Sequence, residues 1–562
     1  MARNVPQSGF RRVLWERPAD PALVRAAGSV AARESPRRWM GEHQVPDGVT
    51  LDRDFGAIPL GPGPAERAIS PMAFHPRQSA RFLVRATIPV GPSGEIPATL
   101  DGGAIYSDAE IRTTLTCGSS RPVGTEADVR TRLDTGVLAQ NGLDGRGVAI
   151  AIVDVGISLA RLSTRLGAPP LLDVDQSWSP PNIVSVPGRH RVGHGTMCAF
   201  DALVAAPKAT LLDIPALAAR SAGDHTAAGT IGAAIQAYWF LITRWVLDGR
   251  PAGLSSLVVS NSWGIYHPSL DFPAGHPGRY VDNPNHPFRS YVRTLTLAGI
   301  DVVFAGSNCG PECPSAPCLK RVTGAIMGAN AYPEVLTLAA CTVTGERLGY
   351  SAKGPPIAGM MTEKPDVTAY SHFLGSLSQS RFTADAGTSA ACAVAAGCVA
   401  ALRTVATPTP TSAAAMVQVL RETALRAGPT NERNEEFGFG ILRPVEAGRS
   451  LGLIPDPLAR SDRPAKGPRG RSWPKGMTVR HETVRRRRPW QAAAKVAQGS
   501  RSFSSIDDTL VVIASKAKQS RKRNVDPRSA GAGMLRDARN DAVAQRRPRR
   551  PHPEVEGGTA LS

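Results

Sequence analysis

Five continuous apolar runs of strand length constrain the fold of this chain more than any other feature. They lie at residues 148–153, 209–214, 257–260, 301–305 and 335–340, and longer segments separate them. A strand that is apolar at every position is buried on both faces, as in a parallel sheet. Strands that alternate with helices form βαβ crossovers. The order therefore predicts an α/β fold of three layers, α/β/α, in which helices cover both faces of a mainly parallel central sheet.

The segments between and after these runs carry helical patterns. We expect helices at residues 125–133, 227–246, 291–298, 390–405 and 413–424. The fourth is apolar and rich in small residues, which is typical of a buried central helix. Before the first apolar run, residues 80–88 alternate in hydrophobicity and predict a further strand.

The net charge of +19 is concentrated in the last hundred residues. From Arg460 to the end there are 25 Lys and Arg against 9 Asp and Glu, so the rest carries only about +3. Such a composition buries too little apolar surface to fold, so we expect a disordered tail. One interpretation is an arm that binds nucleic acid. The other, which we favour, is read-through without selected function, because residues 511–520 and 535–541 resemble translated bacterial intergenic repeats. No nucleic-acid partner is therefore expected.

The chain also lacks the sequence signals of a membrane protein. No run of eighteen or more apolar residues occurs, so no membrane association is expected. Residues 1–30 contain no apolar core like that of a secretory signal. These observations predict a cytoplasmic location.

Three short motifs carry candidate catalytic side chains. Asp154 follows the apolar run at 148–153, His194 lies in a Gly-His-Gly turn, and Ser389 lies in a Gly-Thr-Ser turn. Taken singly, they are compatible with a loop cap, a structural turn and a helix N-cap. In the order Asp, His, Ser, they match one of the three known chain orders of a catalytic triad.

These motifs resemble the signature blocks of the subtilisin-like serine peptidases (subtilases, peptidase family S8). The resemblance extends over residues 145–451, where five further blocks stand in register. They lie at residues 260–264, 304–310, 332–338, 350–355 and 364–369. The resemblance implies a serine endopeptidase that hydrolyses protein or peptide substrates through an acyl-enzyme intermediate. The alternative is a weakly active or inactive subtilase fold that serves as a binding or regulatory module.

The resemblance also assigns roles to individual residues. Ser389 is expected to be the nucleophile, His194 the general base, and Asp154 the group that orients the imidazole. The side-chain amide of Asn308, together with the backbone N–H of Ser389, is expected to form the oxyanion hole.

Other residues of the resemblance are expected to bind the substrate or to modify the rate. Ser262, Trp263 and Gly264 correspond to the segment that pairs with the substrate backbone, and Trp263 is expected in the wall of the S1 pocket. Three residues depart from the family pattern, of which Ala393, in place of a Pro in the first helical turn, is expected to be tolerated. Val155 replaces a Ser or Thr, which removes a hydrogen-bonding hydroxyl beside Asp154, and Ser307 replaces a Gly, which adds a Cβ beside Asn308.

Eight cysteines are present, four of them in apolar segments that indicate core positions. These four are Cys198, Cys341, Cys392 and Cys398. Another three, Cys309, Cys313 and Cys318, follow Asn308 closely and are compatible with a metal site, a disulfide or a reduced surface loop, of which we favour the last. Residues 265–287, with three histidines, are expected to be a substrate-facing insertion rather than a metal site. We assign no metal ligand and expect no cofactor. Structural calcium is common in the family, but the sequence contains no acidic cluster to which we can assign it.

The patterns divide the chain into four regions. Residues 1–79 are rich in Pro, Gly and Arg and are expected to be irregular. Residues 80–140 form either a propeptide-like segment or an accessory α+β segment. Residues 141–455 form the peptidase domain, and residues 456–562 form the basic tail.

Overall fold

The computed structural model describes the greater part of residues 9–456. The described residues are 9–18, 45–52, 54–61, 79, 81–113, 116, 121–181, 185–217, 228–361, 363–378, 382–428 and 432–456. The predicted disordered tail lies outside them. No helix among the described residues combines the length and the apolar character needed to cross a membrane.

The core of the molecule is a parallel sheet in the order β14-β13-β12-β11-β8-β9, and each neighbouring pair in it is parallel. Its strands are β8 (Val148–Val153), β9 (Thr210–Ile214), β11 (Ser256–Asn261), β12 (Asp301–Ala305), β13 (Leu336–Cys341) and β14 (Val367–Tyr370). The five apolar runs are the first five of these strands, so the prediction of a parallel sheet is confirmed.

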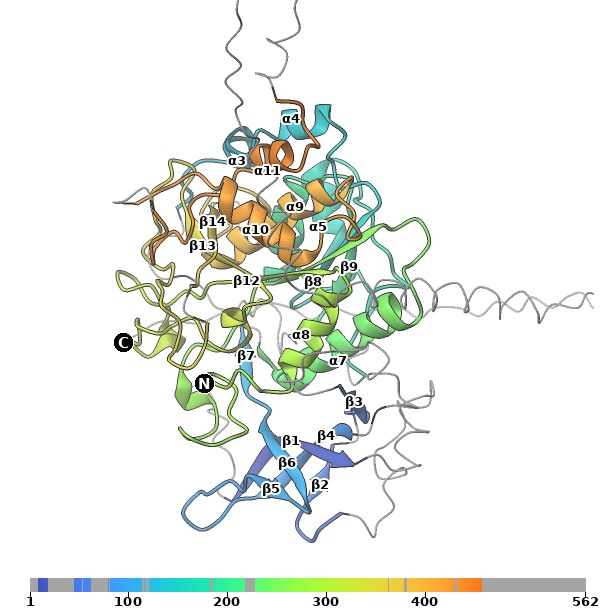
Figure 1. The fold of residues 1–562 in the computed structure, drawn as a ribbon, viewed down its shortest axis with the longest axis vertical. Coiled ribbons are helices and arrows are strands. Elements are labelled where there is room, and N and C mark those ends of the chain that lie inside the picture. The colour runs from blue at the N-terminus through green and yellow to red at the C-terminus, as the bar shows by residue number, and fades with distance from the viewer. Residues whose placement is uncertain are drawn as a thin grey trace, which may run out of the picture. The chain divides into compact units, whose positions relative to one another are not determined.

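Helices cover both faces of this sheet (Figure 1). One layer contains α5 (Leu159–Leu166), α6 (His194–Leu203), α9 (Gly387–Arg403), α10 (Ala413–Thr423) and α11 (Pro444–Ser450), with α3 (Glu126–Arg132) and α4 (Thr135–Gln140) beside it. The other contains α7 (Ile231–Ile242), which continues as a π-helical turn at Thr243–Leu247, and α8 (Phe288–Leu297). The three-layer α/β/α fold is therefore confirmed.

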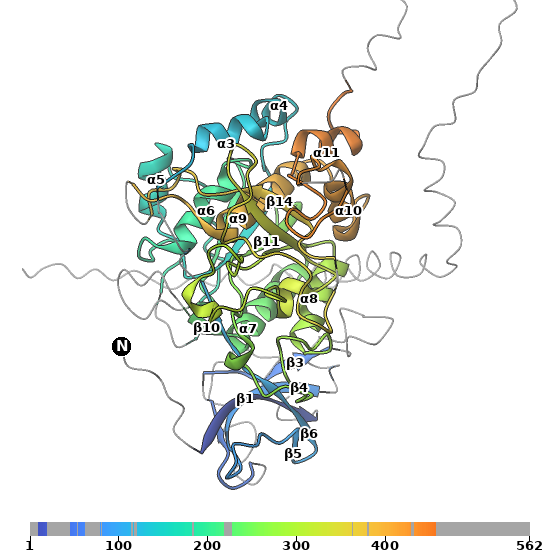
Figure 2. The ribbon, with the colours of Figure 1, turned by 90° about the vertical axis from the view of Figure 1, so that its left-hand side faces the viewer.

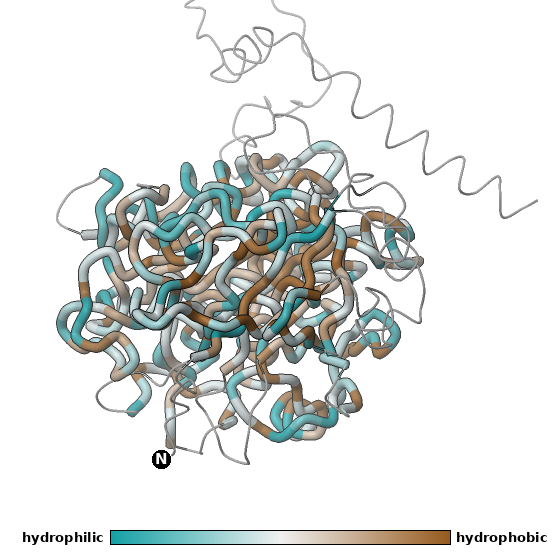
Figure 3. The backbone as a smooth tube through the Cα atoms, turned by 90° about the horizontal axis from the view of Figure 1, so that it is seen from below, coloured by the Kyte–Doolittle hydropathy of each residue, from teal (hydrophilic) through white to brown (hydrophobic). Residues whose placement is uncertain are grey.

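The strand β8 shows why its sequence is apolar throughout. Ile150 and Ile152 belong to the core under α6 and α9, whereas Ala149, Ala151 and Val153 belong to the core under α7 and α8. Both faces are dry, so no polar position interrupts the strand. Figure 3 shows the same result, with the hydrophobic segments gathered in the interior.

A second sheet precedes the three-layer domain and packs beside the α7 and α8 layer (Figure 2). It is antiparallel, and its strands are β1 (Phe10–Pro18), β2 (Thr50–Leu51), β3 (Ile58–Leu60), β4 (Arg81–Pro89), β5 (Thr99–Leu100) and β6 (Gly103–Ser107). The strand predicted at residues 80–88 is confirmed as β4.

The prediction that residues 1–79 are irregular is wrong for β1, β2 and β3. In β1, Val13, Leu14 and Trp15 are all fully buried, which breaks the alternation expected of a half-buried strand. Val13 and Trp15 face the core of the second sheet, while Leu14 faces the core under α7. The flanking charges are satisfied in the fold, since Arg17 pairs with Asp101 at 2.7 Å. Because β1 is buried on both faces, its sequence lacks the alternation of apolar and polar residues by which a strand is predicted.

Candidate active site

Asp154 and His194 are joined by a hydrogen bond at the carboxyl edge of the parallel sheet. Asp154 follows β8, and His194 is the first residue of α6. His194 Nδ1 lies 2.9 Å from both carboxylate oxygens of Asp154. Both side chains are almost completely buried, at 0% and 4% exposure. A carboxylate in this position holds the imidazole in one orientation and stabilises its protonated form.

Two further groups surround the Asp154 carboxylate. The backbone N–H of Val155 donates to Oδ1 at 2.8 Å, which is the contact that remains where the family has a hydroxyl. Cys198, one turn after His194, places its Sγ 3.7 Å from Asp154 Oδ2 and from His194 Nδ1. Burial, with the Asp154 charge beside it, raises the pKa of the Cys198 thiol. The sequence alone did not indicate that Cys198 contacts this pair.

The three side chains of Asp154, His194 and Cys198 also form the one group of possible metal ligands among the described residues. Their ligand atoms lie within 4.8 Å of one another. The carboxylate and the imidazole already satisfy each other, so this group needs no ion to neutralise it.

Ser389 lies in the first turn of α9, close to the end of β11. Its Oγ donates to the carbonyl of Ser262 at 3.4 Å, and Ser262 Oγ donates to the carbonyl of Ser389 at 3.1 Å. His194 Nε2 is buried and has no hydrogen-bond partner among the described residues. Catalytic hydrogen bonds are often long or unaligned before substrate binds. The Ser389 hydroxyl therefore rests on Ser262 in this conformation.

Asn308 lies at the end of β12 and contacts the same turn of α9. Its Oδ1 accepts hydrogen bonds from the backbone N–H and the hydroxyl of Thr388, at 2.9 and 3.0 Å. These two bonds fix which side of the amide faces Thr388. A Cβ added to Gly387, whose φ is +84°, would lie 3.0 Å from Asn308 Nδ2 and 3.5 Å from Ser389 Oγ. The amide nitrogen and the hydroxyl therefore border one small space, which only glycine leaves open.

Ser307 adopts a conformation that its side chain disfavours. Its φ is +83°, in the left-handed region that favours glycine. Its Oγ is buried and has no hydrogen-bond partner among the described residues. The replacement of the family's glycine thus introduces local strain directly before Asn308.

The prediction that Cys309, Cys313 and Cys318 are reduced on a surface loop is wrong. Cys309 and Cys318 are fully buried and form a disulfide, with an S–S distance of 2.05 Å. Cys313 is disulfide-bonded as well. The loop folds back on itself, which brings sulfur atoms together that the spacing alone could not pair. Cys198, Cys341, Cys392 and Cys398 are free and buried, as predicted.

The expected substrate-binding segment is divided between the core and the site. The indole of Trp263 is 1% exposed and packs against Phe304 and Phe288, with ring centroids 5.1 and 6.1 Å away. This placement does not support the prediction that its side chain forms a pocket wall. The backbone of Gly264, the next residue, does take part in strand pairing.

A short strand, β7 (Glu110–Arg112), pairs with the backbone of Gly264. Arg112 pairs with Gly264 in antiparallel fashion, through hydrogen bonds of 2.9 and 3.1 Å. On its other edge, β7 pairs with β10 (Ala228–Thr230). The chain that links the second sheet to the three-layer domain is thus held by backbone hydrogen bonds on both sides, at Gly264 and at β10. No pattern in the sequence indicates this pairing.

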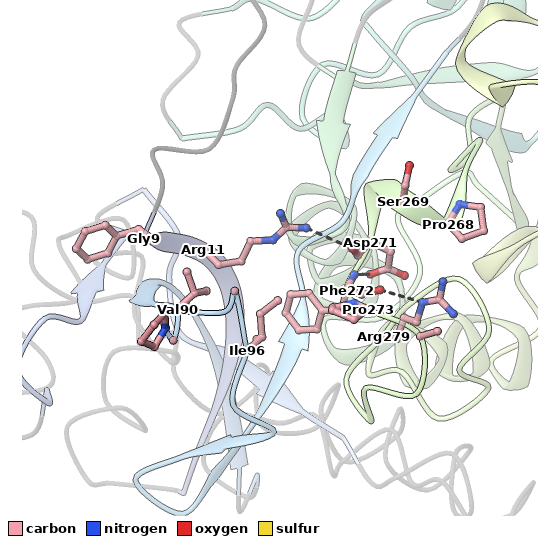
Figure 4. Close-up of a pocket in the computed structure, with 15 residues that line it drawn as sticks. Gly9, Arg11, Val90, Ile96, Pro268, Ser269, Asp271, Phe272, Pro273 and Arg279 are labelled. Carbon is pink, nitrogen blue, oxygen red and sulfur yellow. Dashed lines mark hydrogen bonds between the residues drawn. The ribbon is translucent and has the colours of Figure 1, made fainter.

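The insertion at residues 265–287 packs against the second sheet. Arg11 donates to the carbonyl of Asp271 at 3.4 Å, and the two elements border a cavity of about 860 Å³ (Figure 4). His286 is buried between the rings of Tyr106 and Tyr280, and burial lowers its pKa to about 3. The insertion therefore contacts the N-terminal sheet, which differs from the predicted substrate-facing position.

A comparison with protein families identifies the three-layer domain. The sequence model of the subtilase family (Peptidase_S8) matches residues 145–440. No curated protein is significantly similar to the chain in sequence. Among solved structures, MycP1 with its N-terminal propeptide removed is 19% identical, with a TM-score of 0.39. The match covers 57% of this chain and 96% of that one.

Proposed function

The chain belongs to the subtilase family of serine peptidases, and from this premise we propose that it is an endopeptidase with the triad Asp154, His194 and Ser389. The observation that carries the proposal is the buried hydrogen bond of His194 Nδ1 to Asp154, at 2.9 Å. Ser389 is buried at the N-terminal turn of α9 and is hydrogen-bonded to Ser262. A lone buried His–Asp pair has structural explanations, but its combination with this serine and Asn308 favours acyl transfer.

The proposed reaction begins when substrate binding releases Ser389 Oγ from the carbonyl of Ser262. The hydroxyl then donates to His194 Nε2, which accepts the proton as Oγ attacks the scissile carbonyl. The imidazolium passes this proton to the leaving amine, and the acyl group stays on Ser389. Water, deprotonated by the same imidazole, then releases the acyl group and restores the serine. The chemistry needs only these side chains and water, and the substrate is a protein or peptide.

Asn308 is proposed to stabilise the negative charge that develops on the carbonyl oxygen. Its Oδ1 is engaged by Thr388, and its Nδ2 borders the space beside Ser389 Oγ. The backbone N–H of Ser389, at a helix N-terminus, supplies the second donor. Loss of one such donor typically costs about 3 to 4 kcal/mol of transition-state stabilisation.

The second candidate is a subtilase fold that binds without catalysis. The presence of all four functional groups favours the enzyme, because a fold without selection for catalysis has no reason to keep them together. Labelling with a fluorophosphonate probe distinguishes the two. We expect labelling of the wild type, none of Ser389→Ala, and unchanged labelling of Ser163→Ala, whose hydroxyl only caps a carbonyl within α5. A folded wild type that labels no better than Ser389→Ala would exclude the enzyme.

We further propose that residues 81–113 act as an inhibitory, propeptide-like module rather than as a simple accessory segment. The support is β7, which is hydrogen-bonded along both edges where an extended peptide would be expected to bind beside Ser262. While β7 stays there, a substrate cannot use the backbone groups of Gly264. The cytoplasmic location predicted above is not part of this proposal, since disulfides at Cys309 and Cys313 favour an oxidising compartment.

A further inference from the structure

Asn308 is held both by its side chain and by its backbone. Thr388 fixes the amide, as described above. The backbone carbonyl of Asn308 accepts a hydrogen bond from the N–H of Ser315, at 2.9 Å. Cys318 Sγ lies 3.7 Å from the same carbonyl oxygen. The loop that follows Asn308 thus returns to Asn308 itself.

The Cys309–Cys318 disulfide closes this loop at its base. Cys309 is the residue next to Asn308, and its Sγ lies 3.8 Å from the carbonyl of Tyr266. Between the two cysteines the chain forms only turns until the short 3-10 helix at Ala316–Cys318. The loop is also attached to its surroundings at Gly310, whose N–H donates to the carbonyl of Tyr350 at 2.8 Å, and at Cys313, which is disulfide-bonded as well. Of these attachments, the Cys309–Cys318 bond is the one that joins the end of the loop, beyond Ser315, to the residue next to Asn308.

We propose that the Cys309–Cys318 disulfide positions Asn308 for its role in the oxyanion hole. The proposal rests on the function proposed above for Asn308. A hydrogen-bond donor acts on the transition state only if it is preorganised, and displacements of about 1 Å cost on the order of 100-fold in rate. The disulfide is a positioning element, because it contacts the backbone of Asn308 rather than the substrate.

The first test removes the bond with Cys309→Ala/Cys318→Ala. We expect kcat to fall at least 10-fold while KM changes less than 2-fold, because transition-state stabilisation is lost and ground-state binding is kept. The matched control is Cys341→Ala/Cys398→Ala, which removes two buried thiols that form no disulfide. Both pairs are assayed where circular dichroism shows them folded.

A double-mutant cycle separates positioning from general destabilisation. In the wild type, Asn308→Ala is expected to lower kcat about 100-fold or more. Without the disulfide, the same substitution is expected to cost less than 10-fold, because the amide is already misplaced. Additive losses, or a kcat within 2-fold of the control pair, would overturn the proposal.

A second variant keeps the test decisive if the double cysteine variant does not fold. Ser315 has φ −58° and ψ 148°, which proline adopts, so Ser315→Pro removes the N–H to Asn308 with little strain. We expect a 3- to 10-fold lower kcat at unchanged KM, with Ser315→Ala as control. Equal kcat in the two variants would overturn the proposal. If the wild type lacks Ser389-dependent labelling, the proposed function fails instead, so the two failures are distinguishable.

Discussion

Arg112 and Gly264 exchange two backbone hydrogen bonds, from the N–H of each to the carbonyl of the other, at 2.9 and 3.1 Å. This is the pairing of two neighbouring residues in an antiparallel ladder. It places the link between the two sheets against Gly264, in the segment expected to bind the substrate backbone. The relationship involves no side chain, so any sequence could make it once the chain passes there.

If the pairing of Arg112 with Gly264 prevents substrate binding, weakening it will increase the activity of the peptidase. Arg112→Pro removes the N–H that donates to the carbonyl of Gly264, and proline is unfavourable inside a strand. We expect fluorophosphonate labelling to become at least 10-fold faster than in the wild type. Arg112→Ala keeps the backbone and should label at the wild-type rate. Equal rates for the proline and alanine variants would contradict the inhibitory role of β7.

Relief of the strain at Ser307 should stabilise the protein. The backbone strain of a non-glycine residue at φ +83° costs about 1 to 3 kcal/mol of folding free energy. Glycine removes this strain, but it also increases the conformational entropy of the unfolded chain, which offsets part of the gain. Ser307→Gly is therefore expected to raise the free energy of unfolding by about 1 kcal/mol, as measured by urea denaturation. Ser163→Gly, in the helix α5, should instead lower it by about 1 kcal/mol. A destabilised Ser307→Gly would show that its buried hydroxyl is needed.

A methyl group at Gly387 should abolish activity. It would lie 3.0 Å from Asn308 Nδ2, in the space that the reacting oxygen is proposed to occupy, on a backbone with φ +84°. We expect Gly387→Ala to lower kcat at least 100-fold. Gly452→Ala is the matched control, because Gly452 has a similar φ of +72° but open space around its Cβ position. Similar activity in the two variants would argue against a reaction at this place.

The buried carboxyl groups of Asp201 and Asp385 should make stability depend on pH. Asp201 lies in α6 and Asp385 in the segment before α9, their carboxyl groups interact electrostatically, and the Ser376 hydroxyl donates a hydrogen bond to Asp385. Burial, with Asp385 and Glu126 nearby, raises the pKa of Asp201 well above its usual value. Burial likewise raises the pKa of Asp385 to about 6, against the opposing effects of Ser376, Asp201 and Arg165. The pair therefore holds a proton that the unfolded chain releases near pH 4.

The sign of the effect follows from these raised pKa values. Above pH 4 the folded chain binds more protons than the unfolded chain. The two carboxyl groups therefore make their full contribution to the free energy of unfolding below pH 4, and this contribution decreases as the pH rises through 6 and beyond. Asp201→Asn keeps the size and shape of the side chain and removes its titration. Relative to the wild type, the variant should gain at least about 1 kcal/mol in the free energy of unfolding between pH 5 and pH 8. A pH-independent difference in urea unfolding would refute the raised pKa of Asp201.

The sequence by itself determined the parallel sheet and the residues that gather at its edge. Runs such as residues 148–153 are apolar at every position because both faces of a central strand are dry, and that pattern is local. The turns at Asp154, His194 and Ser389 are local as well. Since the carboxyl ends of parallel strands meet at one edge, the sequence also places Asp154 after β8 and Asn308 after β12 at that edge.

Only the tertiary structure decided that β7 pairs with Gly264 and that a disulfide closes the loop after Asn308. Because β1 is buried on both faces, its sequence does not alternate between apolar and polar residues. The pairing of β7 with Gly264 uses backbone N–H and C=O groups, which every residue except proline has. The state of Cys309 depends on where Cys318 lies in space, and Trp263 turns to the core because Phe288 and Phe304 surround it. These features arise from contacts between segments far apart in the chain, which no local pattern records.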